Sequence, residues 1–177
     1  GLLFELLLRE LFEFRLVQTD PNFANYRYDT ATRQLILLDF GATRPYKASM
    51  SRDFKRMIQG AMAADRNTMA TACLAIGYFD ATNQDKHQQA VLDIGQQALE
   101  PFSQVGAYDF GTSDLPQRIR ATGLALGMDR EFWKIPPADA MLLQRKFGGL
   151  YLLAIRLRAS VDVHALAQRA LQRAPKA

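Results

Sequence analysis

Two short strand-like runs narrow the choice of fold for this chain of 177 residues more than any other feature. Residues 25–28 (NYRY) and 34–40 (QLILLDF) are rich in aromatic and branched side chains, as strands are. The polar stretch 29–33 between them has the composition of a turn, so we expect a β-hairpin. The patterns elsewhere are helical. The sequence therefore predicts a mainly α (α+β) fold, a helical bundle with one β-hairpin, in a single domain of residues 1–177.

The helical segments differ in how they begin. Residues 1–16 (GLLFELLLRELFEFRL) have a strongly apolar helical pattern without a capping residue before it, so we expect the chain to be a piece of a longer protein. Residues 138–159 are apolar nearly all round in their second half, so we expect this helix to be central. The expected capping residues of the other helices are Ser51, Asp65, Thr82, Ser113 or Asp114, and Asp162.

Composition excludes several classes of function. The chain is 49% hydrophobic, which is ordinary for a globular domain, and no run reaches the roughly 18 apolar residues of a membrane span. The net charge is only +4, and aromatic side chains do not alternate with basic ones, so we expect no nucleic-acid partner. The single cysteine, Cys73, lies in an apolar run and is expected in the core. One cysteine suits a reducing compartment, so we expect the cytoplasm or the mitochondrial matrix, peripheral to a membrane at most, and no secretion.

Basic residues gather toward the C-terminus. From Met141 onward there are seven Lys or Arg and one acid, Asp162. Two interpretations stay open: the solvated faces of two helices, or a surface for an anionic membrane, a lipid intermediate or a partner protein. The second would make this chain a non-catalytic helical module.

Three polar residues lie where the regular patterns stop. Pro21 forces Asp20 out of helical geometry, Asn25 precedes the first strand, and Asp39 closes the second, followed by Phe40-Gly41. A hairpin brings its two ends together, so Asn25 and Asp39 should lie side by side, with Asp20 on the loop that leads to them. Carboxylate and amide oxygens are the ligands that Mg²⁺ prefers. We therefore expect Asn25 and Asp39 to bind Mg²⁺ or Mn²⁺, and Asp20 to be the catalytic acid or base.

The spacing of these residues matches a phosphotransfer site. Protein kinases use an Asp in the catalytic loop, an Asn five residues later and then an Asp-Phe-Gly turn, and both the Asn and the second Asp bind metal. Asp20, Asn25 and the turn at Asp39 have this order and this first interval. The competing interpretation is structural, with all three side chains serving only local turns.

Longer stretches resemble a known family. Residues 18–25 (QTDPNFAN) and 35–44 (LILLDFGATR) closely resemble the atypical kinase-like proteins of the UbiB type, which are linked to ubiquinone (coenzyme Q) biosynthesis. They look like the eukaryotic and proteobacterial branch, which has QTDPN in place of ADPHPGN. Residues 100–102 (EPF), 108–111 (YDFG) and 142–153 (LLQRKFGGLYLL) look like the C-terminal lobe of the same branch. The resemblance covers essentially the whole chain.

The resemblance implies a C-lobe of the protein-kinase-like fold. It implies that Asn25 and Asp39 hold the metal and, through it, the phosphates of ATP, and that Asp20 is the catalytic-loop acid. Such proteins are kinase-like ATPases that act on or near membrane-bound lipid intermediates. The family's N-terminal lobe, with its KxGQ segment, Ala-rich loop, lysine and glutamate, is absent from this sequence. We therefore expect the chain alone to bind ATP weakly and to be inactive. A small-molecule phosphotransferase remains the alternative enzyme class.

Other residues have less specific patterns. We expect His87 to be exposed, and His87 and His164 to be too isolated for a zinc site. Arg44 is expected either to face phosphate or to pair with a local acid. The second Asp-Phe-Gly, at residues 109–111, should be a loop anchor. Phe132 and Trp133 are expected to serve core or helix-entry packing, with a membrane anchor as the alternative. Close helix packing is expected at Gly148-Gly149, with a lipid-facing groove as the alternative.

Overall fold

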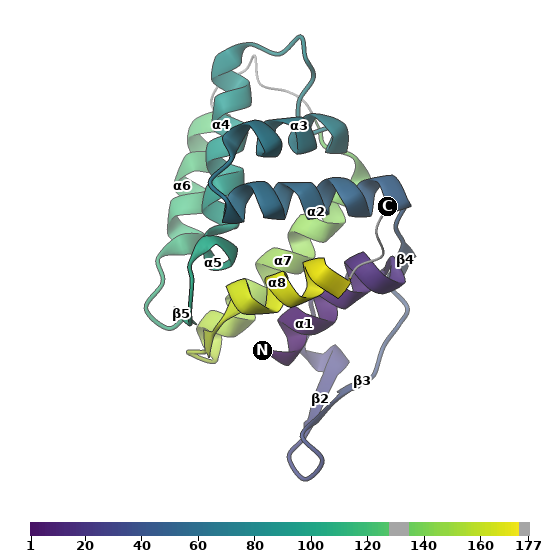
Figure 1. The fold of residues 1–177 in the computed structure, drawn as a ribbon. Helices are drawn as coiled ribbons and strands as arrows, with labels where there is room; N and C mark the ends of the chain where they lie inside the picture. Colours follow the sequence, from purple (N-terminus) through teal and green to yellow (C-terminus); the bar gives the residue numbers. More distant parts are fainter. Residues whose placement is uncertain (128–134, 174–177) are drawn as a thin grey trace.

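The computed structural model describes residues 1–127 and 135–173, with the side chains of 125–127 left aside, and shows a mainly α fold, as expected (Figure 1). A π-helical turn, η1 (Glu10–Phe14), follows the first helix, and a 3₁₀ turn, η2 (Phe23–Asn25), precedes the hairpin. The helices are α1 (Leu2–Arg9), α2 (Ala48–Met62), α3 (Arg66–Ile76), α4 (Asp85–Ala98), α5 (Glu100–Ser103), α6 (Leu115–Gly127), α7 (Ala138–Arg156) and α8 (Val163–Arg173). The strands pair as β1 (Leu16–Gln18) with β4 (Thr43–Pro45), β2 (Tyr26–Asp29) with β3 (Gln34–Leu37), and β5 (Tyr108–Asp109) with β6 (Ser160–Val161).

The predicted hairpin is confirmed as β2–β3, which extends from the helical body at the bottom of Figure 1. The strands are antiparallel, and Asp29 Oδ1 accepts a hydrogen bond from the amide of Ala31 in the turn (2.9 Å). One boundary was wrong. The second strand ends at Leu37, so Asp39 lies two residues beyond it in a turn rather than closing the strand.

A second antiparallel pair, β1–β4, holds both ends of the segment that contains the hairpin. Gln18 lies opposite Thr43, and the amide and hydroxyl of Thr19 both donate to the carbonyl of Ala42 (3.0 and 2.8 Å). The sequence analysis expected a single hairpin and missed this pair and β5–β6. Runs of two or three residues are too short to produce a periodic pattern, and their partners are distant in the sequence.

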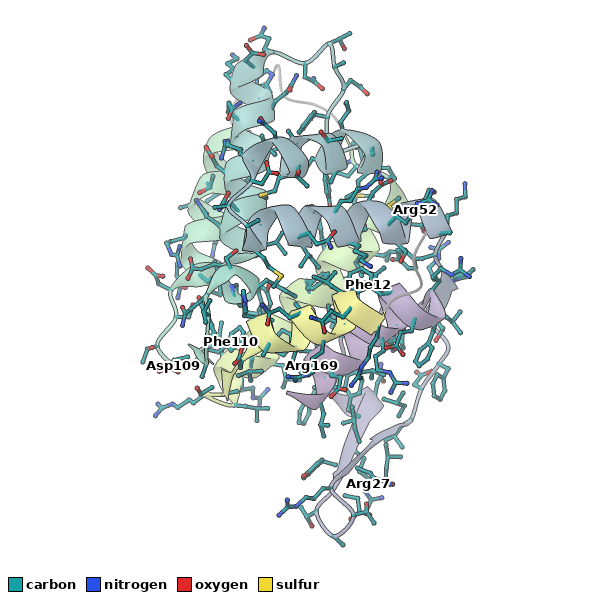
Figure 2. All side chains as sticks on the ribbon, in the orientation of Figure 1. Phe12, Arg27, Arg52, Asp109, Phe110 and Arg169 are labelled. Carbon is teal, nitrogen blue, oxygen red and sulfur yellow. The ribbon has the colours of Figure 1, made fainter. Side chains whose placement is uncertain are left out.

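The first helix is part of the core. As expected, no side chain caps α1 at Gly1. Its buried face continues through the π-helical turn to Leu11 and Phe12, which are 0% and 4% exposed. Phe12 and Phe110, both labelled in Figure 2, are buried. The ring of Phe110 stacks on Phe4 with 5.4 Å between centroids, and so joins the N-terminal helix to the loop of the second Asp-Phe-Gly. The prediction that this second motif is a loop anchor is confirmed.

The expected caps had mixed outcomes. Asp65 and Asp162 accept hydrogen bonds from the amides of Thr68 (3.0 Å) and Ala165 (2.8 Å), as predicted. Ser51 was wrong: α2 begins three residues earlier, at Ala48, and the buried Ser51 hydroxyl donates instead to the carbonyl of Leu11 (2.7 Å).

The expected cap Thr82 was also wrong. Helix α4 begins at Asp85, after Gln84, which makes no capping hydrogen bond with its side chain. At the next helix the expectation holds, since Ser113 Oγ accepts from the amide of Leu115 at the start of α6 (3.2 Å).

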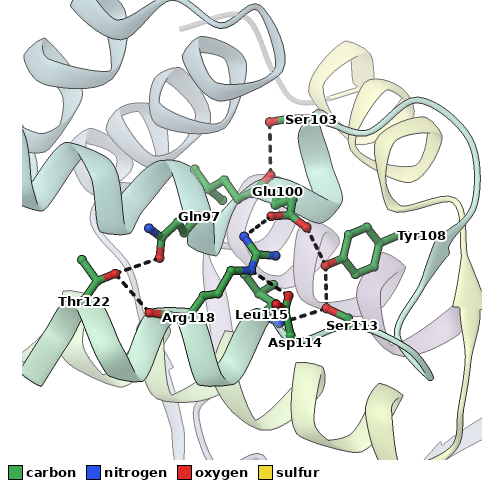
Figure 3. Close-up of polar contacts among 10 residues, drawn as sticks. Gln97, Glu100, Ser103, Tyr108, Ser113, Asp114, Leu115, Arg118 and Thr122 are labelled. Carbon is green, nitrogen blue, oxygen red and sulfur yellow. Dashed lines mark hydrogen bonds and ion pairs between the residues drawn. The ribbon is translucent and has the colours of Figure 1, made fainter.

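A polar network fixes the corner between α4, α5 and α6 (Figure 3). Glu100 accepts from Arg118 Nη1 (2.7 Å) and from the hydroxyl of Tyr108 (2.8 Å). Arg118 Nε also donates to Asp114 (2.7 Å), and the hydroxyls of Tyr108 and Ser113 are 2.7 Å apart. The arginine first, and then the tyrosine, hold the pKa of Glu100 below its ordinary value.

Several single-residue expectations can now be compared with the fold. Cys73 is buried in the core as expected, and burial raises the pKa of its thiol to about 12. His87 was expected to be exposed but is 3% exposed, because α4 turns it inward together with Leu92 although its neighbours in the sequence are polar.

Phe132 and Trp133 lie outside the described residues. Within the described part of the chain, no helix is both long and apolar enough to cross a membrane.

Candidate functional site

The loop between β1 and β2 brings two of the three predicted site residues together. Asn22 caps the 3₁₀ turn by accepting from the amide of Ala24 (3.0 Å), and the turn carries Asn25 inward, where it is 7% exposed. Asn25 Nδ2 then donates to Asp20 Oδ2 at 3.0 Å. The five-residue interval noted in the sequence is therefore the span that lets this amide reach the carboxylate.

The third predicted residue, Asp39, is held close to Asn25 by a backbone hydrogen bond of the residue before it. The amide of Leu38, its neighbour, donates to the carbonyl of Asn25 (3.0 Å). Asp39 Oδ1 accepts from the amide of Gly41 (2.7 Å), which closes the turn around Phe40. The open end of the hairpin thus holds Asn25 and Asp39, as the hairpin argument required, with the Asp39 side chain exposed to solvent.

The side chains at this end of the hairpin carry oxygen atoms of the kind that hard divalent cations bind. The hydrogen bond to Asp20 uses Asn25 Nδ2 and not the amide oxygen Oδ1, and the hydrogen bond from Gly41 uses Asp39 Oδ1 and not Oδ2. An amide oxygen with carboxylate oxygens is a donor set suited to Mg²⁺. Among the described residues no group of three or more His, Cys, Asp or Glu could hold a metal.

Helix α7 reaches this loop from more than a hundred residues away in the sequence. Arg145 Nη2 lies 3.4 Å from Asp20 Oδ1, and Lys146 Nζ donates to Gln18 Oε1 (3.0 Å) and to the hydroxyl of Tyr26. The sequence analysis assigned no role in the site to Arg145, Lys146, Gln18 or Tyr26. Gln18, Arg145 and Lys146 entered it only as letters of the stretches that resemble the family, and the two basic residues also as part of a basic C-terminal region.

A glycine allows this close approach. A Cβ atom on Gly149 would overlap the ring of Pro21, whereas one on Gly148 would meet nothing within 4 Å. The expectation of close packing at this pair holds for Gly149, but the partner is the loop that carries Asp20 and not another helix.

The contacts of α7 bury charge beside the loop. Lys146 is 1% exposed, and Glu10, from the π-helical turn, is 6% exposed. Desolvation lowers the pKa of Lys146 and raises that of Glu10, and the attraction between the two opposes both shifts. Burial, together with the charges of Glu10 and Asp20, raises the pKa of Tyr26 to about 12. Among the described residues, Glu10 Oε2 and Gln18 Nε2 have no hydrogen-bond partner, so this cluster carries unsatisfied polar atoms.

The two histidines lie in different settings. His164 Nδ1 lies 2.6 Å from the carbonyl oxygen of Phe102, and His87 lies inside the helical body. Arg44 is exposed on β4 opposite Val17. This position does not distinguish between its two expected roles, facing phosphate and pairing with a local acid.

Known proteins match this chain over most of its length. Residues 1–73, which include Asp20, Asn25 and Asp39, match the ABC1 atypical kinase-like domain. The chain is 35% identical over 170 residues to the rat (Rattus norvegicus) atypical kinase COQ8B, mitochondrial, a match that covers 94% of this chain and 31% of the relative. It is 34% identical over 163 residues to the Saccharomyces cerevisiae atypical kinase COQ8, mitochondrial, covering 88% and 31%. A probable serine/threonine-protein kinase of Dictyostelium discoideum, abkA, is 30% identical over 164 residues, covering 89% and 29%.

Proposed function

Because this chain belongs to the ABC1 atypical kinase-like family, we propose that it carries the metal-binding and catalytic-loop half of an ATP-dependent phosphotransfer or ATPase site. The observation that carries the proposal is the hydrogen bond from Asn25 to Asp20 at the open end of a hairpin that continues into Asp39-Phe40-Gly41. A structural turn needs no such link between two loop residues and the end of a hairpin, whereas phosphotransfer requires these groups together.

Each residue has a distinct role in this proposal. Asn25 Oδ1 and a carboxylate oxygen of Asp39 would hold Mg²⁺ or Mn²⁺, which would neutralise the charge of the phosphates when bound. Asp20 orients the attacking hydroxyl or water and accepts its proton. The hydrogen bond from Asn25 Nδ2 keeps the Asp20 carboxylate in one orientation, and Arg145 limits its movement from the side of α7.

The wider function follows from the relatives and is part of the proposal. The chain spans about a third of the length of the rat and yeast relatives, and these are named mitochondrial atypical kinases. We propose that the whole protein supports ubiquinone biosynthesis in mitochondria, that its remaining part grips the nucleotide, and that this chain alone does not turn over ATP.

The second Asp-Phe-Gly provides a matched control for a metal-binding test. Asp109 Oδ1 accepts from the amide of Gly111 (2.8 Å), as Asp39 does from Gly41, but no Asp-x₄-Asn loop precedes it. We expect Mn²⁺ to bind this chain weakly, Asp39→Asn to abolish the binding, and Asp109→Asn to leave it unchanged. Isothermal calorimetry or paramagnetic broadening of amide signals measures this. Equal binding by the wild-type chain and Asp39→Asn would refute the proposed site.

A further inference from the structure

Lys146 occupies an unusual position for a lysine. It is 1% exposed on α7, and lysine is rarely buried so fully unless it is paired. Its ammonium group donates to Gln18 Oε1 at 3.0 Å and to the hydroxyl of Tyr26, and lies 5.2 Å from the centre of the Tyr26 ring. These partners are 128 and 120 residues away in the sequence, so tertiary packing alone brings them together.

The two partners stand at the two ends of the loop that carries the candidate site. Gln18 is two residues before Asp20, and Tyr26 directly follows Asn25. A hydrogen bond donated by an ammonium group is stronger than one between neutral groups, and breaking it here would leave a buried acceptor without a partner. One ammonium group therefore holds both ends of the loop at a common point.

Stability alone is a poor explanation for this arrangement. Removing Lys146 from water disfavours its charged form, and the attraction of Glu10 and Asp20 offsets only part of that cost. Methionine has a similar length and would fill the same space without burying a charge. A buried lysine is better explained by a requirement for the geometry of Gln18 and Tyr26 than by a gain in folding free energy.

We propose that Lys146 is a positioning residue for the catalytic loop, which fixes Asp20 and Asn25 relative to each other by binding Gln18 and Tyr26. This inference deepens the proposed function and rests on it. Because its ammonium group is buried, Lys146 acts through its two partners and does not touch the phosphates or the metal. Gly149, one helical turn further along α7, allows the same helix to contact Pro21 in the middle of the loop.

The test compares three changes to this contact in the present chain. Lys146→Met removes the donor, and the double variant Gln18→Met/Tyr26→Phe removes both acceptors but keeps side chains of similar size. The third variant combines all three substitutions. Lys47→Met is the matched control, because Lys47 is an exposed lysine before α2. For each protein we would measure the Mn²⁺ dissociation constant, the melting temperature, and hydrogen exchange at the amides of residues 19–25 without metal.

If Lys146 positions the loop, Lys146→Met should raise the Mn²⁺ dissociation constant by roughly tenfold or more, the usual size of effects from groups that orient metal ligands. The double variant should show a similar loss, and the triple variant should be no weaker than either, because the same contact is already absent. Amide exchange should accelerate at residues 19–25 and stay unchanged in α3. Lys47→Met should match the wild-type chain.

Two results would overturn the inference. One is a lower melting temperature for Lys146→Met with Mn²⁺ affinity and loop exchange unchanged, which would make Lys146 a core residue only. The other is a triple variant much weaker than both of its parents, which would mean that Lys146 acts through other groups. If the wild-type chain binds no Mn²⁺, the proposed function fails. In that case the inference is tested by amide hydrogen exchange in the metal-free protein. Faster exchange confined to residues 19–25 in Lys146→Met supports the inference, and an unchanged exchange rate refutes it.

Discussion

Two aspartates in this chain show how much the surroundings decide the role of a residue. Asp39 and Asp109 each precede Phe-Gly, and each accepts a hydrogen bond from the glycine amide, at 2.7 and 2.8 Å. Phe110 is buried at 1% exposure and anchors its loop, whereas Phe40 is 60% exposed. The local turn is the same in both cases. The difference is that Asp39 lies next to Leu38, whose amide bonds to Asn25, and the proposed metal site depends on this neighbourhood.

Glu100 allows a prediction about pH at the level of a single residue. Arg118 and Tyr108 depress its pKa in the folded state below 4.5, so its contribution to stability is present above about pH 4.5 and is lost as the pH falls through the folded-state pKa. We expect Glu100→Gln to destabilise the chain at pH 7, and the difference from wild type to shrink below pH 4.5. Urea unfolding at a series of pH values measures this, and a difference independent of pH would contradict it.

Among the elements, α7 is the one that links the core to the candidate site. Its buried residues Leu150, Tyr151 and Ala154 pack into the body, and the Tyr151 hydroxyl donates to the carbonyl of Ala98 (2.7 Å). On the same helix, Lys146 and Gly149 contact the loop that carries Asp20 and Asn25. A rigid helix anchored in the core can hold a loop in place, which a loop alone cannot do.

The adjacent glycines of α7 provide a matched pair of substitutions. Gly148→Ala adds a methyl group where nothing lies within 4 Å, so it should stabilise the helix by up to about 1 kcal/mol. Gly149→Ala places the methyl group against Pro21 and should cost about 1–3 kcal/mol or displace the loop. Urea unfolding and amide chemical shifts of residues 19–25 measure both effects. Equal behaviour of the two variants would contradict the contact with Pro21.

For the molecule as a whole, an aromatic cluster joins segments that are far apart in the sequence. The ring of Phe110 contacts those of Phe4 (5.4 Å), Tyr108 (4.8 Å) and Tyr151 (5.7 Å). These rings come from the first helix, the segment around β5, and α7. Helix α1 also packs against the last helix, α8 (Figure 1). The first and last parts of the described chain should therefore unfold together.

Removing one ring from this cluster tests that cooperativity. Phe110→Ala should cost about 3–5 kcal/mol, because it leaves a cavity among buried rings. Phe14→Ala is the control. Phe14 is 53% exposed and contacts Arg9, so its loss should cost less than about 1 kcal/mol. Denaturant unfolding followed by both fluorescence and circular dichroism measures the two variants. Separate transitions for the two signals would show that the ends of the chain unfold independently.

The predictions from sequence were best where the cause was local. The hairpin was found because two branched and aromatic runs flank a polar turn, and Asp65 was recognised as a cap because its acceptor reaches an amide three residues away. Ser51 was misassigned because the same side chain can bond to a distant carbonyl, here that of Leu11. His87 was misassigned because the polarity of its neighbours does not report which side of α4 packs inward.

The amino-acid sequence by itself determined the helical class, the hairpin and the order Asp20, Asn25, Asp39, because short-range patterns and intervals specify all of these. Only the tertiary structure decided which side chains surround that loop. Lys146 meets Gln18 and Tyr26, and Gly149 meets Pro21, across separations of more than a hundred residues. Such contacts depend on how the helices pack together, and periodicity along the chain carries no information about that packing.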